Sequence, residues 1–63
     1  GDRLFIVSGI RLDAVIISNL LGQRLKRYEK PGTIIETGDM EAGVYLISFQ
    51  SGEIIWTTKF IKQ

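Results

Sequence analysis

Turn-forming residues divide this chain into short segments, and their spacing limits the possible folds more than any other feature. Between the turns lie runs rich in β-branched and aromatic residues, spaced about every 8–12 residues, as in antiparallel sandwiches and barrels. The turn signals are SG at 8–9, NLLG at 19–22, KPG at 30–32, TGDMEAG at 37–43 and QSG at 50–52. We therefore expect strands at 3–7, 12–19, 23–29, 33–37, 43–50 and 53–62.

The stretch DAVIISNLLGQRLKR at 13–27 also resembles an amphipathic helix with a basic end, which would suit a membrane surface or a nucleic acid. Two features oppose a helix. Val15, Ile16 and Ile17 are adjacent β-branched residues, whose side chains lose rotamer freedom in a helix. Gly22 would cost about 1 kcal/mol in a helix interior. The stretch is therefore predicted to form two strands joined by a bend.

Alternation along these two strands predicts which way their side chains point. Successive side chains of a strand point to opposite faces of the sheet. Val15 and Ile17 should then face the core, with Ile16 and Ser18 on the other side. We also expect the bend to lie at 19–22, Leu20 or Leu21 to cover one end of the core, and Arg24 and Lys26 to point outward around Leu25.

The size and composition of the chain restrict it to one small domain. Residues 1–63 form a single domain in this interpretation, with 44% hydrophobic residues and neither Cys nor His. A domain of this size buries only roughly 60% of the surface that its unfolded chain exposes. Disulfides and the usual zinc ligands are not available to stabilise it. The net charge of +1 is not typical of a nucleic-acid-binding protein.

The residue types that support catalysis are scarce, and we expect neither an enzyme nor a bound cofactor. Without His or Cys, the common general base and the thiol nucleophiles are missing. Asp39 and Glu41 share a loop, but two carboxylates are too few for a calcium site. Tyr28, Trp56 and Phe60 could line a sugar-binding face. The alternative is that Trp56 fills the core, as large aromatic residues do in small β domains.

The sequence MEAGVY at 40–45 has the spacing of a tyrosine corner. In this feature of Greek-key sandwiches, a Tyr near the start of a strand donates its hydroxyl to the backbone a few residues upstream. We expect Tyr45 to do so, with Gly43 making the turn and Met40 filling the core.

Three segments together resemble the C-terminal sorting domain of the type IX secretion system, which is found on secreted proteins of one group of Gram-negative bacteria. They are LDAVIISNLLGQRL, MEAGVYLISF and the ending TTKFIKQ. Within them Asn19, Gly22, Met40, Gly43 and Tyr45 match family motifs with structural roles. The match covers residues 2–63 in order, with the third segment at the C-terminal end.

This resemblance implies an all-β fold, a small Ig-like antiparallel β-sandwich with about six strands in this sequence. It also implies a non-catalytic signal that directs an N-terminal cargo domain from the periplasm to the cell surface or the medium. The implied partners are the outer-membrane translocon, its shuttle and a sortase-like peptidase that removes the domain. The tail is the implied recognition segment, comprising Lys59, Phe60, Ile61, Lys62 and Gln63; the competing interpretation is an edge strand with lysines reaching to solvent.

Members of this family usually begin with a strand that carries an Asn-Pro motif, and this sequence starts after it. A sandwich without that strand has an open edge, and open edges recruit strands from other chains. We therefore expect dimerisation or a strand-exchanged homodimer. The second functional hypothesis is an Ig-like adhesion or carbohydrate-binding module attached to a secreted enzyme. Native sequence beyond Gln63 would favour that second hypothesis.

Overall fold

The computed structural model describes residues 3–5, 9 and 11–63, and all of the regular structure in these residues is β. The six strands lie close to the expected ranges, and the predicted all-β sandwich is confirmed. Residues 6 and 7 of the first predicted strand lie outside the described residues. The strands are β1 (Arg3–Phe5), β2 (Ala14–Ser18), β3 (Arg24–Glu29), β4 (Ile34–Glu36), β5 (Gly43–Ser51) and β6 (Ile54–Lys62).

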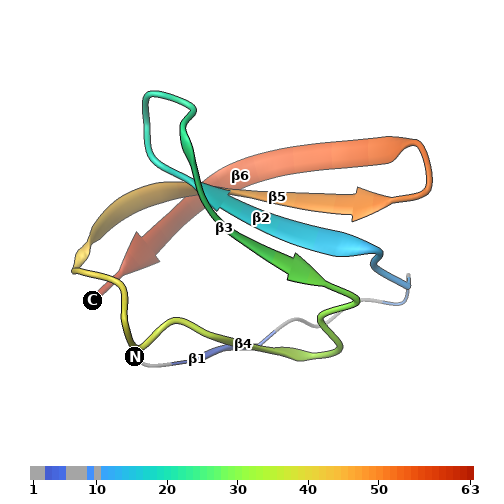
Figure 1. The fold of residues 1–63 in the computed structure, drawn as a ribbon, viewed down its shortest axis with the longest axis horizontal. Helices are drawn as coiled ribbons and strands as arrows, with labels where there is room; N and C mark the ends of the chain where they lie inside the picture. Colours follow the sequence, from blue (N-terminus) through green and yellow to red (C-terminus); the bar gives the residue numbers. More distant parts are fainter. Residues whose placement is uncertain (1–2, 6–8, 10) are drawn as a thin grey trace.

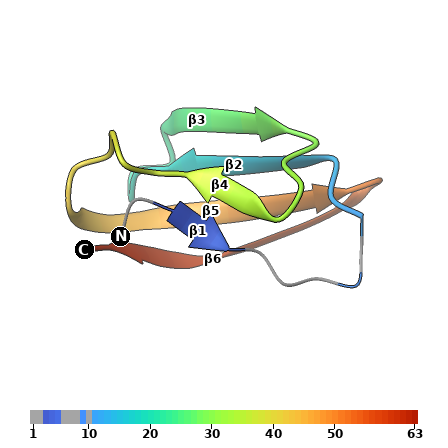
Figure 2. The same cartoon turned by 90° about the horizontal axis from the view of Figure 1, so that it is seen from below.

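The strands form two antiparallel sheets that lie one over the other (Figures 1 and 2). The larger sheet has the strand order β3-β2-β5-β6, and the smaller is the pair β1-β4. Figure 2 shows the pair crossing one side of the larger sheet. We call that side of the larger sheet the inner face and the opposite side the outer face. Strands β2 and β5 are central, whereas β3 and β6 form the two edges.

The core lies between the two sheets and consists mainly of aliphatic side chains. Val15 and Ile17 of β2 contribute to it, as predicted, and Ile47 is paired with Ile17 on the neighbouring strand. From the smaller sheet, Ile35 supplies the opposing buried side chain. The half-buried residues packed around this cluster are Leu4, Tyr28, Met40, Tyr45, Phe49 and Phe60.

The bend between β2 and β3 is confirmed, and the side chain of Asn19 organises it. Asn19 Oδ1 accepts hydrogen bonds from the backbone N–H groups of Leu21 and Gln23, both at 3.0 Å. Gly22 adopts a φ of 88°, which favours glycine. The predicted covering of the core by Leu20 or Leu21 is wrong, because they are 61% and 86% exposed. The loop that carries them projects away from the β1-β4 pair (Figure 1).

The predicted orientation of the basic residues on β3 is also wrong in part. Lys26 is opposite Ile17 on β2, so it belongs to the inner face. A register shift between Ile17 and Ser18 then brings Arg24 opposite Ser18. At such a bulge, two residues of one strand lie opposite a single residue of its partner, so the alternation of side chains is interrupted there. Arg24 therefore lies on the outer face, whereas Lys26 does not, and Leu25 is exposed.

Lys26 and Tyr28 connect the inner face of β3 to the segments that cross it. Lys26 Nζ forms an ion pair with the carboxylate of Asp39. The hydrogen bond within this ion pair raises the pKa of Lys26 and lowers the pKa of Asp39. The Tyr28 hydroxyl donates to the Glu36 carbonyl oxygen at 2.9 Å, which links β3 to β4. Burial raises the pKa of Tyr28, with the charge of nearby Lys26 acting in the opposite direction.

The raised pKa of Tyr28 predicts a loss of stability at high pH. The contribution of Tyr28 to the stability of the fold should be fully present below about pH 10, the usual pKa of a tyrosine. It should disappear as the pH rises through the higher folded-state pKa. Tyr28→Phe should therefore cost about 1 kcal/mol at neutral pH, and this difference from the unmodified protein should shrink at alkaline pH. Urea unfolding at a series of pH values measures the difference. A gap that stays constant with pH would contradict this assignment.

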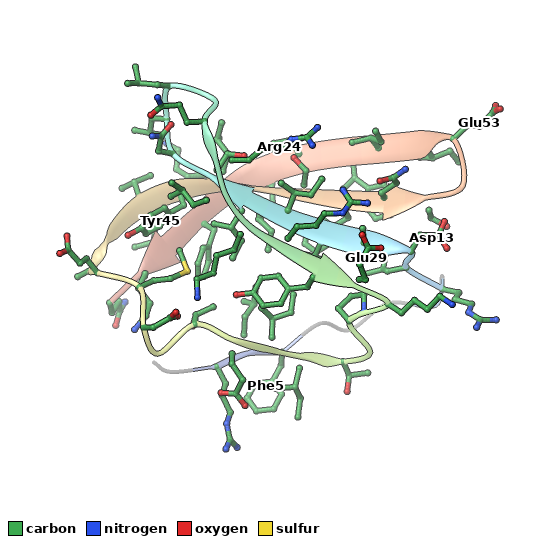
Figure 3. All side chains as sticks on the ribbon, in the orientation of Figure 1. Phe5, Asp13, Arg24, Glu29, Tyr45 and Glu53 are labelled. Carbon is green, nitrogen blue, oxygen red and sulfur yellow. The ribbon has the colours of Figure 1, made fainter. Side chains whose placement is uncertain are left out.

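Asp13 joins three segments at the end of the larger sheet where the β5-β6 turn lies (Figure 3). Its backbone N–H donates to the Gln50 carbonyl at 2.8 Å, and its own carbonyl accepts from Lys30 N–H at 2.9 Å. Its carboxylate Oδ2 accepts from Gly52 N–H at 2.6 Å. Gly52 is the first residue of the two-residue turn, where its φ of 60° fits a type II′ hairpin. The start of β2 is thereby held both to the end of β3 and to the β5-β6 hairpin.

Candidate recognition site

The predicted recognition tail is the end of the edge strand β6. The pairing with β5 continues up to Lys62, which is opposite Gly43. Alternation divides the tail between the two faces of the sheet. Lys59 and Ile61 lie on the outer face and are exposed, and the exposed fraction of Ile61 is 62%. These two side chains, together with Gln63 just after the strand, which is also exposed, are the part of the tail that a partner can reach without any change in the domain.

The inner-face residues of the tail are built into the fold. Phe60 is half-buried against the core, and its ring centroid lies 6.2 Å from that of Tyr45 on the paired strand. Lys62 is only 8% exposed, with its Nζ 3.4 Å from the Gln63 carbonyl oxygen. Lys62 therefore differs from a snorkelling side chain, whose charged head stays in water. Phe60 and Lys62 are therefore poorly placed for direct contact with a partner.

Lys59 belongs to a row of side chains that runs across the outer face. From edge to edge the paired residues are Arg24, Ser18, Leu46 and Lys59. Figure 3 shows Arg24 on the side of the larger sheet that faces away from the β1-β4 pair. The row therefore carries one cation at each edge with smaller or apolar residues between them. This row cannot be read from the sequence, since Arg24 and Lys59 are aligned across the sheet only by the pairing of all four strands.

Exposed apolar side chains continue this surface next to Lys59. Val44 is opposite Ile61 on the outer face, and both are exposed. We call Val44, Leu46, Lys59 and Ile61 the outer patch. Its mixture of a flexible cation and branched apolar groups suits a protein surface that offers an acidic group beside an apolar one. No catalytic chemistry follows from these residue types.

The tyrosine corner predicted at Tyr45 is present. The Tyr45 hydroxyl donates to the Glu41 carbonyl oxygen at 2.6 Å. Met40 packs against the core cluster, as expected. Gly43 differs from the expectation, because it begins β5 and the turn lies just before it, closed by a bond of 3.0 Å from Met40 N–H to the Thr37 carbonyl. The corner fixes the path by which the chain enters β5.

Trp56 is on the inner face at the β6 edge, where the smaller sheet does not fully cover the larger one. It stacks on Phe49 of the paired strand, with ring centroids 5.7 Å apart, and remains 38% exposed. Trp56 therefore does not fill the centre of the core. The three aromatic residues considered for a sugar-binding face are also separated, because Tyr28 lies on the opposite edge strand β3.

The acidic loop before β5 offers little for a cation. The Asp39 carboxylate is held by Lys26, and the Glu41 carbonyl by Tyr45. Within residues 3–5, 9 and 11–63, no three His, Cys, Asp or Glu side chains gather in a way that could hold a metal ion. The same residues contain no helix with the length and apolar character needed to cross a membrane.

Comparison with known proteins leaves the family open. No family model, curated protein or solved structure matches the chain.

Proposed function

We propose that this domain is a non-catalytic sorting signal of the type IX secretion class, which directs an N-terminal cargo domain across the outer membrane. Its partners would be the translocon, its shuttle and a sortase-like peptidase. The domain would pass through the periplasm on its way to the cell surface or the medium. The exposed side chains of Lys59 and Ile61 in the tail would contact the secretion machinery.

The observation that carries this proposal is the position of the resembling segments in the fold. Asn19 and Gly22 form the bend between two strands, and Tyr45 forms a corner at the start of β5. The third segment is the basic edge strand β6, with its outward side chains accessible. Each segment thus has a distinct task in one small sandwich. That arrangement suits a signal that is recognised as a folded surface.

A secretion assay tests the proposal. Residues 1–63, preceded by their native upstream sequence, would be fused to a reporter in a cell with a working type IX system. Deleting Phe60–Gln63 is a poor variant, because it removes a ring packed in the core together with the tail. Lys59→Ala combined with Ile61→Ala changes only exposed side chains. We expect this double variant to melt like the unmodified domain but to retain the reporter in the periplasm.

The matched control is Ile54→Ala combined with Ile55→Ala, at the other end of β6. These side chains are also exposed, and the control should be secreted normally. If the unmodified domain fails to direct the reporter out of the cell, the sorting function is wrong. If the Lys59 and Ile61 variant is secreted like the control, the domain can still be a signal, but the side chains of Lys59 and Ile61 are not what is recognised.

A carbohydrate-binding module is the second candidate, and one observation favours it. The stacked pair of Phe49 and Trp56 is partly exposed on the inner face, and a flat aromatic surface suits the apolar face of a sugar ring. Titration of the chain with a panel of oligosaccharides tests this candidate through the fluorescence of Trp56, the single tryptophan. A saturable change in fluorescence would support it, and an unchanged spectrum across the panel would argue against it.

A further inference from the structure

The outer edge of β6, which no described strand covers, has few of the features that usually keep an edge strand from pairing with another chain. Its register with β5 is unbroken from Ile54 to Lys62. No strand of residues 3–5, 9 and 11–63 pairs with its other side. It contains no proline, and Lys59 is its single charged residue before the last position. Natural edge strands are usually short, bulged, charged or interrupted by proline.

The opposite edge strand, β3, has features that discourage pairing with another chain. It has a register shift beside Ser18. Its sequence RLKRYE carries three cations, so a second copy of β3 would bring like charges together. Strand β1 has only three residues. Of these strands, β6 is the one whose edge is both long and unprotected.

The residue pattern of β6 is complementary to itself around Thr58. In an antiparallel pair of two β6 strands centred on Thr58, each Trp56 lies opposite Phe60 of the second copy. On the outer face, each Ile55 lies opposite Ile61 of the second copy. Lys59 lies opposite Thr57, which keeps the two lysines from facing each other. The exposed apolar side chains from 55 to 61 all gain apolar partners in this register.

Neighbouring registers lose this match. Side chains that face each other must lie on the same face, so the register can change only in steps that keep this parity. Centring the pair on Lys59 places two ammonium groups directly opposite each other, which is destabilising. Centring it on Thr57 places Ile55 opposite Lys59. The register centred on Thr58 is therefore favoured over both neighbours.

The aromatic residues of the inner face extend across such a pair. Within the chain, Phe49 is opposite Trp56, and Tyr45 is opposite Phe60. Joining Trp56 to Phe60 of the second copy produces a continuous row from Phe49 of one copy to Tyr45 of the other. Cross-strand aromatic pairs of this kind stabilise sheets. The row also covers Trp56, which is partly exposed in the single chain.

The backbone of β6 is in the correct phase for this pairing. In antiparallel strands, every second residue directs its N–H and C=O groups to the same neighbour. Ile54 pairs with Ser51 across the two-residue turn, so the groups that point to the free edge belong to Ile55, Thr57, Lys59 and Ile61. In the register centred on Thr58 these residues face one another. Thr58 then forms a pair without hydrogen bonds, in which the Cα atoms are about 4.5 Å apart.

We propose that two copies of this chain associate through antiparallel pairing of β6 centred on Thr58, which joins their larger sheets into one. The inference does not rest on the sorting function. Each copy keeps all of its own strands, so this association differs from strand exchange. An interface made by one strand edge is small, and the complex should be weak and concentration-dependent.

Single-cysteine cross-linking tests the register, because the chain has no cysteine of its own. In the proposed dimer, two copies of Thr58→Cys face each other at a distance that a disulfide can span. The two copies of Thr57→Cys, or of Lys59→Cys, are diagonal neighbours about 7–8 Å apart, which is too far. We expect mild oxidation to give a covalent dimer with Thr58→Cys and a nearly complete loss of that product with the other two.

Sedimentation velocity over a range of concentrations provides the second measurement. Thr57→Pro removes an N–H group that points to the free edge and leaves the ladder with β5 intact. We expect it to stay monomeric where the unmodified chain dimerises, with circular dichroism showing that it is folded. Ile61→Lys, which places a charge opposite Ile55, serves the same purpose if the proline variant does not fold.

Several results would overturn the inference. One is a monomeric mass for the unmodified chain at millimolar concentration. Others are equal cross-linking at the three positions, or stronger cross-linking at position 57 or 59 than at 58. A dimer that persists in both edge variants would point instead to strand exchange or another surface. None of these results depends on whether the domain acts in secretion.

Discussion

Replacing Ile17 with alanine should lower the free energy of unfolding by about 2–5 kcal/mol, the range for truncating a buried aliphatic side chain. Ile17 is 0% exposed, lies on the central strand β2 and contacts the core between the sheets. A domain of this length has a total stability of roughly 3–9 kcal/mol. We therefore expect the variant to be largely unfolded, or close to unfolding, at room temperature.

Urea unfolding followed by circular dichroism and by Trp56 fluorescence measures this loss. Ile61→Ala is the matched control, since it removes the same atoms from an exposed site on the outer face. The control should change the stability by about 0.5 kcal/mol or less. Similar losses for the two variants would contradict the assignment of the core to the face that carries Val15 and Ile17.

The second large effect is expected at the tyrosine corner. Tyr45→Phe keeps the ring contacts with Phe60 but removes the hydroxyl that donates to the Glu41 carbonyl. We expect a cost of about 1 kcal/mol, because a protein hydrogen bond contributes roughly that much to stability. Thermal unfolding of the two proteins under the same conditions measures the difference.

A matched control separates the corner from a general effect of losing a hydroxyl. The Thr57 hydroxyl bonds to Ser48 at 2.7 Å on the outer face, and Thr57→Val removes it while keeping a β-branched side chain. That bond joins two solvent-accessible side chains and anchors no loop, so the control should cost about 0.5 kcal/mol or less. If Tyr45→Phe has the same melting temperature as the unmodified protein, the hydrogen bond of the corner contributes nothing to stability.

The strands and the bend could be predicted from local sequence because each depends on nearby residues. Adjacent β-branched residues at 15–17 excluded a helix, and Asn19 and Gly22 have the chemistry that a tight bend requires. The corner was predictable for the same reason, since the donor and the acceptor are four residues apart. Alternation also placed Val15 and Ile17 correctly on the buried face.

Other features depend on pairings that the sequence does not show. Simple alternation puts Lys26 on the outer face, which is wrong because the register shift beside Ser18 interrupts the alternation. The apolar character of Leu20 and Leu21 predicts that they cover the core, yet the loop exposes both side chains. The row from Arg24 to Lys59 arises only once four strands are aligned.

The bonds of Asp13 have a consequence for the kinetics of folding. Asp13 joins Lys30, at the end of the β2-β3 hairpin, to Gln50 and Gly52 in the β5-β6 hairpin. Hairpins close through short loops, whereas the bonds from Asp13 to the second hairpin span most of the chain. We expect these bonds to form late, after the main barrier has been crossed. Interactions that form after the barrier slow unfolding and leave the folding rate nearly unchanged, so we expect Asp13 to set how long the domain stays folded and to have little effect on how fast it folds.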